Sequence, residues 1–159
     1  MIFLTVGTQL AFDRLVTAVD TWAGMEPGRD VVAQIGPTDI RPRHLRAQAF
    51  FEPAECRQLM IEADVIVAHA GMGTILSALE LAKPLLVVPR KAALGEHRND
   101  HQVATAARFA ELGRLSVAAD ELELVQRLDQ LETLTANEQI GPYASDHLVS
   151  ALRTFIAAS

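Results

Sequence analysis

Short apolar segments recur along this chain, and each is followed by a turn and then by a helical pattern. The segments at 2–6, 31–35, 65–69 and 85–88 are almost uniformly apolar. A half-exposed antiparallel strand would alternate polar and apolar residues, so these strands are expected in a parallel sheet that is covered on both faces. We therefore predict an α/β fold: a doubly wound, Rossmann-like parallel sheet with helices on both faces.

Apolar residues at helical spacing occupy the stretches between these segments, and two shorter apolar stretches at 47–51 and 115–118 are further predicted strands. The helix near 103–110 is expected to pack through one face: Val103, Ala106, Ala107 and Ala110. The predicted helices cover 13–23, 53–63, 75–82, 103–110 with a stop at Gly113, 122–131 and about 146–156. Ligands of such sheets bind outside the carboxyl ends of the strands, so a site is expected in the loops that follow them.

The length and composition are typical of one globular unit. With 159 residues, of which 50% are hydrophobic and 21% charged, we expect 1–159 to form a single domain. No apolar run approaches the roughly 20 residues that span a bilayer, and residues 1–6 lack the basic start of a signal peptide. A cytoplasmic location is therefore expected. Cys56 is the only cysteine, which allows neither an intrachain disulfide nor a cysteine-based zinc site.

Negative charge is concentrated in one part of the chain. The net charge is −6, and residues 111–139 hold seven acids against two arginines, so residues 1–110 are nearly neutral. A nucleic-acid-binding surface needs a basic balance, and no nucleic-acid partner is expected. One basic cluster is the exception: Arg41, Arg43, His44 and Arg46. We interpret it as a solvated loop, with a protein partner or anionic lipid head groups as the alternatives.

The sequence His-Ala-Gly-Met-Gly-Thr at 69–74 is the most informative motif. Gly71 and Gly73 would let the backbone approach a ligand, and the helix that follows offers unpaired N–H groups and the positive end of its dipole. An anion site, above all for a diphosphate, is one interpretation. A simple tight turn is the other, and the local sequence favours neither. The spacing matches neither the dinucleotide-binding fingerprint nor a P-loop.

Three further stretches extend this motif into a pattern. The chain has Thr-Val-Gly-Thr-Gln at 5–9, Lys-Pro-Leu-Leu-Val-Val-Pro-Arg at 83–90 and Gly-Glu-His-Arg-Asn-Asp-His-Gln at 95–102. Together with 69–74 they resemble the C-terminal domain of glycosyltransferase family 28, from Met1 to about Gly113. The family includes small stand-alone chains, among them subunits of bacterial exopolysaccharide glycosyltransferases and of the dolichol-linked chitobiose-forming enzyme. The exopolysaccharide subunits are the more similar group.

This resemblance implies the donor-binding half of a GT-B fold, which holds a UDP-sugar at the carboxyl ends of its strands. In the family, the donor diphosphate lies against the glycine-rich turn. Arg90 and His97 would add positive charge beside the diphosphate, with a merely solvated loop as the alternative. The residues assigned in this way to the diphosphate are Gly7, Thr8, Gln9, His69, Gly71, Met72, Gly73, Thr74, Arg90 and His97.

The resemblance also implies sites for the other parts of the donor. The uracil would lie beside Phe50 and Phe51, for which core packing is the simpler interpretation. The element that binds sugar hydroxyls maps onto four residues: Asn99, Asp100, His101 and Gln102. Carboxylate and amide groups suit this task because they accept from and donate to vicinal hydroxyls in fixed directions. Asp100 could instead cap the helix that follows.

One position departs from the family's pattern. Where many members have a glutamate that binds the ribose hydroxyls, this chain has Ser77, and the nearest acid is Glu80. Three helical residues advance about 4.5 Å and stop about 60° short of a full turn, so Glu80 would replace that glutamate imperfectly. Ser77 and Glu80 are both taken as candidate ribose-binding residues.

The resemblance indicates catalysis and assembly in outline. Candidate acid/base groups are His69 and His101, although an orienting hydrogen bond is the simpler role for His69. The family's acceptor site and catalytic base lie on a second domain, so we expect a membrane-anchored partner that binds a lipid-linked or polysaccharide acceptor. The chain would then be attached peripherally to the membrane. No metal or other cofactor is expected, since N–H groups and basic side chains would stabilise the departing UDP.

Several alternatives stay open at this point. The donor sugar could be that of UDP-N-acetylglucosamine, UDP-glucose or UDP-glucuronate. A non-catalytic scaffold subunit with the same fold is the main competing function, and the replacement of glutamate by Ser77 supports it slightly. A nucleotide-sugar epimerase or hydrolase would need a second domain, so the chain length argues against it. In the absence of a partner, exposed apolar surface would favour a homodimer.

Overall fold

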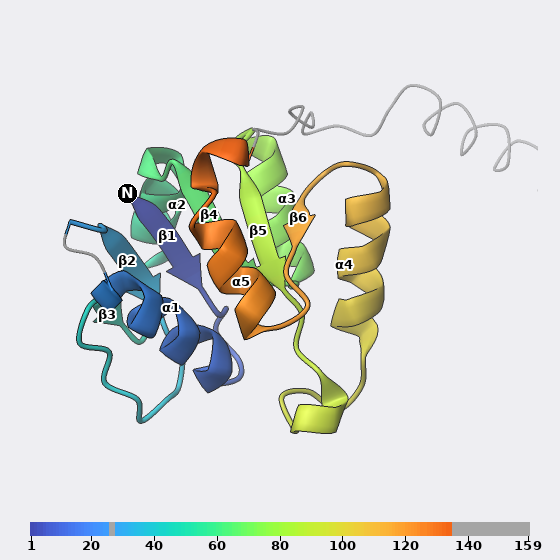
Figure 1. The fold of residues 1–159 in the computed structure, drawn as a ribbon, viewed down its shortest axis with the longest axis horizontal. Helices are drawn as coiled ribbons and strands as arrows, with labels where there is room; N and C mark the ends of the chain where they lie inside the picture. The colour runs from blue at the N-terminus through green and yellow to red at the C-terminus, as the bar shows by residue number, and fades with distance from the viewer. Residues whose placement is uncertain (26–27, 135–159) are drawn as a thin grey trace, which may run out of the picture.

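A computed structural model describes residues 1–25 and 28–134. Six parallel strands form one sheet with the order β3-β2-β1-β4-β5-β6 (Figure 1). The strands are β1 (Ile2–Thr5), β2 (Val31–Gln34), β3 (Arg46–Gln48), β4 (Val65–His69), β5 (Leu85–Val88) and β6 (Ser116–Val117). The helices are α1 (Asp13–Met25), α2 (Pro53–Glu62), α3 (Met72–Glu80), α4 (His101–Glu111) and α5 (Glu121–Leu128), with 3-10 turns at Ala92–Leu94 and Leu131–Thr133. The helix predicted at about 146–156 lies outside the described residues.

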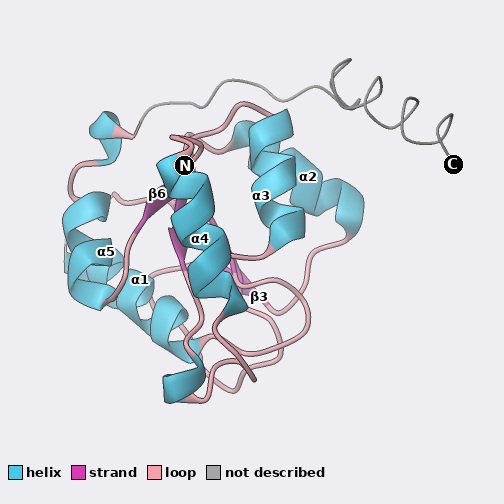
Figure 2. Cartoon of the chain, turned by 90° about the vertical axis from the view of Figure 1, so that its right-hand side faces the viewer, coloured by secondary structure: helices cyan, strands magenta, loops and turns pink. Residues whose placement is uncertain are grey.

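Both faces of the sheet are buried, which confirms the predicted doubly wound arrangement. In β1, the neighbouring side chains of Phe3 and Leu4 point to opposite faces, and both are fully buried. Leu4 packs with apolar residues of α1 and α5, whereas Phe3 packs with residues of α2, α3 and α4. Figure 2 shows α1 and α5 on one side of the sheet and α2 and α3 on the other.

The contact between α1 and α5 is fixed by polar groups as well as by its apolar core. Trp22 of α1 is buried, and its indole N–H donates to the Asp129 carboxylate at 2.8 Å. The guanidinium of Arg29 stacks on the Trp22 ring at 3.8 Å from the ring centroid. A buried tryptophan needs an acceptor for its N–H group, so Asp129 lets the large ring enter the core without an unsatisfied donor.

The end of α4 confirms the predicted stop. Gly113 adopts a φ of +65°, its N–H donates to the Ala110 carbonyl at 2.9 Å, and the Arg114 N–H donates to the Phe109 carbonyl at 2.9 Å. These two bonds form a Schellman motif, which needs a left-handed residue at the position of Gly113.

The buried face of α4 differs from the prediction. Gln102 and Ala106 are buried and Phe109 is partly buried, whereas Val103 is 38% exposed. Ala107 and Ala110, predicted on the inner face, are exposed as well. Because the Gln102 amide accepts a hydrogen bond from the Arg90 backbone N–H at 3.2 Å, that side of the helix faces inward.

Strand β3 also departs from the prediction. It was expected at 47–51, but it covers Arg46–Gln48 and pairs with β2 from Val32↔Arg46 to Gln34↔Gln48. Backbone bonds from the Ile35 and Gly36 N–H groups to the carbonyls of Gln48 and Ala49, both of 2.9 Å, follow the strand, and the Phe51 N–H then donates to the side chain of Gln34 at 3.1 Å. Among the described residues, no helix is long and apolar enough to cross a membrane.

The position of α4 can be tested with the same substitution at two adjacent alanines. Ala106→Glu would bury an unpaired carboxylate and is expected to lower the free energy of unfolding by roughly 3 kcal/mol or more. Ala107→Glu, on the exposed face, should change it by about 0.5 kcal/mol or less. Urea unfolding followed by circular dichroism measures both. Equal losses in the two variants would contradict this orientation of the helix.

Candidate functional site

The candidate site lies where the strand order reverses. Strand β1 pairs with β2 on one side and with β4 on the other. The loop after β1 leads to α1 on one face of the sheet, and the loop after β4 leads to α3 on the opposite face. Diverging loops of this kind leave a crevice at the carboxyl ends of the two strands. A cavity of about 530 Å³ occupies that position.

The cavity brings together most of the residues predicted from the sequence. They come from the loops after β1, β4 and β5 and from the first turns of α3 and α4. The predicted residues that line it are Gly7, Thr8, Gln9, His69, Gly71, Gly73, Thr74, Ser77, Arg90, His97, His101 and Gln102.

Two buried polar residues of the cavity wall were not predicted. Gln34 ends β2, and its amide nitrogen donates to the Thr5 hydroxyl at 3.2 Å and to the Gly7 carbonyl at 3.4 Å. The Thr5 hydroxyl also accepts the Gly7 N–H at 3.2 Å. This network ties the ends of β1 and β2 to the loop that follows β1. The signal for Gln34 and Thr5 was available in the sequence, because each is a polar residue in an otherwise apolar strand.

The imidazole of His69 explains two of the glycines. A Cβ atom at Gly71 would lie 2.1 Å from His69 Nε2, and one at Gly7 would lie 2.8 Å from His69 Cε1. The ring therefore fills the space that side chains at these two positions would need. At Gly73, by contrast, a Cβ atom would meet nothing within 4 Å. The tight-turn interpretation thus accounts for Gly71, but it does not account for Gly73.

His69 is neutral at physiological pH. Burial and, to a smaller extent, the positive charge of Arg90 lower the pKa of His69 to about 4, against a smaller opposite effect of the Thr5 backbone. Its Nδ1 atom is buried and makes no hydrogen bond with the described residues. A group with so low a pKa is a weak general base at neutral pH, so the positioning role is the better supported one for His69.

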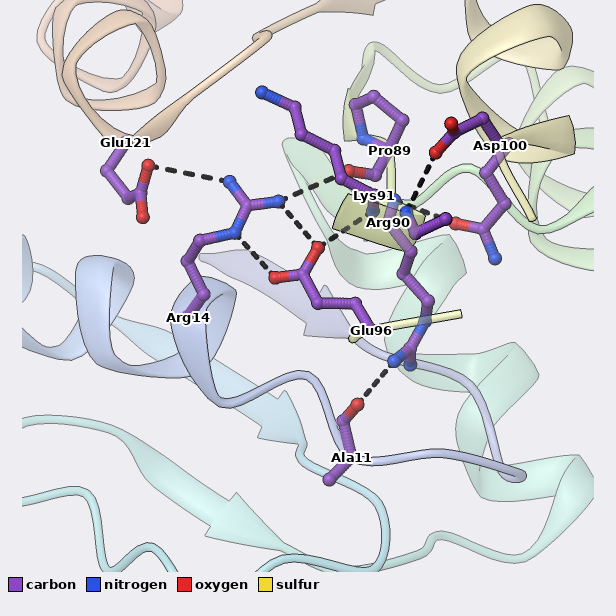
Figure 3. A network of polar contacts seen from close by, with 10 residues as sticks. Ala11, Arg14, Pro89, Arg90, Lys91, Glu96, Asp100 and Glu121 are labelled. Atoms are coloured by element: carbon purple, nitrogen blue, oxygen red, sulfur yellow. Dashed lines mark hydrogen bonds and ion pairs between the residues drawn. The ribbon is translucent and has the colours of Figure 1, made fainter. Parts of the chain in front are cut away.

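Arg90 lines the cavity, and its guanidinium is bound by the protein's own backbone. Its guanidinium donates to the Ala11 carbonyl (Figure 3). It also donates to the carbonyls of Val6 at 2.9 Å and Leu10 at 2.8 Å, and it lies over the Phe12 ring at 4.6 Å. Both terminal nitrogens of Arg90 donate to carbonyls of the loop after β1. Arg90 therefore brings positive charge to the cavity wall, while these N–H groups bond to the protein. Burial lowers the pKa of Arg90 from its ordinary value.

Two histidines meet at the opposite wall of the cavity. The rings of His97 and His101 are T-shaped, with centroids 4.5 Å apart. His97 Nδ1 is buried and finds no partner among the residues described here, whereas His101 Nδ1 contacts the Asn99 side-chain oxygen. Beside them, the Gln102 carbonyl oxygen is used by the Arg90 N–H, which leaves its amide nitrogen for a ligand.

Several predicted residues do not line this cavity. Asp100 accepts the Ala92 N–H at 2.8 Å, and its side chain does not cap α4. Glu80 lies 4.0 Å from Arg57 in an exposed ion pair and does not line the cavity. Met72 is 49% exposed although the turn that contains it reaches the cavity. Asn99 is engaged with His101 instead.

A smaller side pocket adjoins the cavity. It has a volume of about 280 Å³ and shares Thr8, Gln34 and Ser77 with the main cavity. Phe51 lines this pocket, and its ring also lies 6.2 Å from the buried Phe3 ring, measured between centroids. Phe51 therefore packs against the core and also forms part of the pocket wall. Phe50, the other predicted uracil contact, is 47% exposed and lines neither space.

The side pocket also includes residues of α2. Cys56 and Met60 line both spaces, and burial raises the pKa of the Cys56 thiol. A raised pKa keeps the thiol protonated and unreactive, so Cys56 is interpreted as a structural residue of the pocket wall. Within the described ranges, 1–25 and 28–134, no group of three or more histidine, cysteine, aspartate or glutamate side chains could hold a metal ion.

The chain is similar in sequence to curated glycosyltransferase subunits. The chain is 31% identical over 123 residues to the UDP-N-acetylglucosamine transferase subunit ALG13 of Mus musculus, which covers 71% of this chain and 10% of the mouse protein. It is 33% identical over 95 residues to the subunit of the same name from Saccharomyces cerevisiae, covering 59% of this chain and 43% of the yeast protein. The chain therefore spans less than half the length of these curated relatives.

The fold comparison covers nearly the whole chain. The solution NMR structure of ALG13 superimposes with a TM-score of 0.61 at 20% identity, over 96% of this chain and 94% of that structure. The fold implied by the sequence resemblance, one half of a GT-B glycosyltransferase, is thereby confirmed. Residues 1–145 match the model of the glycosyltransferase family 28 C-terminal domain, and this chain belongs to that family.

Proposed function

We propose that this chain binds a UDP-sugar in the cavity and serves as the donor-binding subunit of a glycosyltransferase. The observation that carries the proposal is Gly73. It lies in the first turn of α3, it lines the cavity, and a Cβ atom at this position would meet none of the described residues outside its own helix within 4 Å. Backbone exposed in this way, beside helix amides that have no intrahelical acceptor, suits a diphosphate that must approach closely.

The donor is proposed to lie across the crevice in one direction. The diphosphate would meet the first turn of α3 and the loop at Gly7–Gln9, with the charge of Arg90 behind it. The uracil would enter the side pocket at Phe51, and the ribose would pass Ser77, which lines both spaces. His97 would stand beside the diphosphate, and the sugar would face His101 and Gln102, where the Gln102 amide nitrogen can donate to a hydroxyl.

The names of the relatives support UDP-N-acetylglucosamine as the donor to test first. UDP-glucose and UDP-glucuronate are tested beside it, because the polar groups described here would also accept their hydroxyls. Transfer would proceed by attack of an acceptor hydroxyl on the anomeric carbon, with cleavage of the bond to the diphosphate and departure of UDP. The hydroxyl proton would pass to a base on the partner, with His101 as the alternative base within this chain.

The acceptor site is proposed to lie on a partner. The relatives are described as subunits, which supports a second chain. By the family resemblance, this partner is membrane-anchored, holds the catalytic base, and binds a lipid-linked or polysaccharide acceptor, as in exopolysaccharide synthesis. The chain would then act in the cytoplasm, attached to the membrane through the partner. A homodimer of the isolated chain stays a prediction, as does a single domain over 1–159.

Replacement of Gly73 tests the donor site without disturbing the core. In Gly73→Val the new side chain meets no protein atom within 4 Å at its Cβ, so folding should be kept while the diphosphate is excluded. We expect at least about a tenfold loss of UDP affinity, which corresponds to about 1.4 kcal/mol. Isothermal titration calorimetry measures it, and Ala107→Val on exposed α4 is the matched control. A folded variant with unchanged affinity, or a wild-type chain that does not bind UDP, would contradict the proposal and favour a scaffold.

Replacement of Gln102 tests the direction of the bound donor. In Gln102→Ala, affinity for UDP-N-acetylglucosamine should fall about fivefold more than affinity for UDP, the effect of one lost hydrogen bond. Any change that acts through the Arg90 N–H affects both ligands equally, so the ratio isolates the sugar contact. Gln58→Ala, on the exposed side of α2, is the control. Equal losses for the two ligands would remove Gln102 from the sugar site.

Removal of divalent cations tests the proposal that the protein holds the diphosphate without a metal. We expect the same UDP affinity in EDTA as in magnesium, because N–H groups and the charge of Arg90 would compensate the phosphate charge. The titration is run in both solutions with the wild-type chain. Binding that disappears in EDTA would show that a metal ion takes part.

A further inference from the structure

Two loops border the entrance of the donor cavity, and a cleft of about 740 Å³ lies between them. One border is formed by Gln9, Leu10 and Ala11 after β1, and the other by residues 95–98 after β5. Gln9, Leu10 and His97 also line the donor cavity, so the cleft and the cavity are continuous. The separation of these two loops therefore determines where His97 stands relative to a bound donor.

Each of the two loops is bound by an arginine from outside it: Arg90, which follows β5, binds the loop after β1, and Arg14 of α1 binds the loop after β5. Arg90 follows β5 and donates to three carbonyls of the loop after β1, as described above. Arg14 belongs to α1, directly after the first loop, and it reaches back to the second. Its Nε donates to Glu96 Oε1 at 2.6 Å, and one terminal nitrogen donates to Glu96 Oε2 at 2.9 Å and to the Pro89 carbonyl at 3.3 Å (Figure 3).

The contact between Arg14 and Glu96 differs from an ordinary surface ion pair. Their side chains are only 14% and 11% exposed, and the pairing is bidentate. Glu96 Oε2 also accepts the Lys91 N–H at 2.9 Å, so one carboxylate closes the loop on itself and fixes it to α1. Glu121 at the start of α5 lies 3.4 Å from a terminal nitrogen of Arg14. Such geometry restricts orientation more strongly than a single exposed contact.

We infer that Arg14 and Arg90 form a reciprocal clamp that fixes the width of the cavity entrance, and that Arg14 and Glu96 are positioning residues for donor binding through His97. The inference rests on the proposed function for its effect on the donor. The clamp itself is a property of the fold. His97 directly follows Glu96 in the chain, so a carboxylate held on both oxygens limits where the imidazole can move.

The ionisation of both partners supports a lasting contact. The pKa of Glu96 is below its usual value: burial acts against this, but hydrogen bonds from Arg14 and from the Lys91 N–H outweigh it. The hydrogen bond to Glu96 raises the pKa of Arg14. The pair therefore stays charged throughout the neutral range. Loss of either partner leaves the other charge largely buried and without its main counterpart.

The test compares Arg14→Met, Glu96→Gln and the double variant with the wild-type chain. UDP affinity is measured by calorimetry, and hydrogen exchange is followed at the amides of 91–98. Each single variant should lower UDP affinity by about tenfold, and the double variant should lose no more than the worse single one, because the two residues act as a unit. Arg14→Lys keeps the charge without the bidentate geometry, so its loss should be intermediate. Arg108→Met, from the exposed pair with Glu111, is the control and should match the wild type.

Exchange at 91–98 separates failure of the clamp from failure of the proposed function. Faster exchange there, with α2 unchanged, is expected in both single variants. Folded variants with wild-type exchange at 91–98, or with faster exchange and wild-type UDP affinity, would overturn the inference. If the wild-type chain does not bind UDP, the proposed function fails. The clamp is then judged by hydrogen exchange alone, and it is rejected if exchange at 91–98 is the same in the single variants as in the wild type. If Arg14→Met does not fold, Arg14→Lys and Glu96→Gln provide the same comparison.

Discussion

Burial of both faces of a parallel sheet is the constraint on which the rest of this structure depends. Helices cover the two faces, so the inner strands are open to a ligand chiefly where they end. In β1, β2 and β4 the last residue is polar: Thr5, Gln34 and His69. The strand order β2-β1-β4 places these three polar strand ends side by side, and all three line the cavity.

The parts of the site that could be predicted from the sequence depend on local features. The glycine-rich turn at 69–74 follows an apolar strand and opens a helix, and both neighbours are visible as periodic patterns. The strands β4 and β5 have the predicted bounds for the same reason, because a buried parallel strand leaves an uninterrupted apolar run. The family resemblance then placed His97, His101 and Gln102 at the cavity, although they lie on a separate loop and helix.

The parts that could not be predicted depend on contacts between distant residues. Arg90 looked like a phosphate ligand because its charge is visible in the sequence, whereas the carbonyls that it binds lie 79 to 84 residues earlier. Asp100 resembled a helix cap, but the Ala92 N–H took its carboxylate. Apolar residues were predicted on the inner face of α4, but Gln102 lies there, because its side chain accepts a hydrogen bond from the buried Arg90 N–H. Polar groups that must be satisfied inside the protein outweigh apolar periodicity in a short helix.

Gly73 has a consequence for how this domain responds to selection. Glycine inside a helix costs about 1 kcal/mol relative to alanine, and here no neighbouring atom excludes a methyl group. Glycine at position 73 therefore lowers the stability of the helix, although the packing around it would accept alanine. Under the proposed function, selection for stability and selection for nucleotide binding would favour different residues at position 73, so a substitution there that stabilises the fold would weaken binding of the nucleotide.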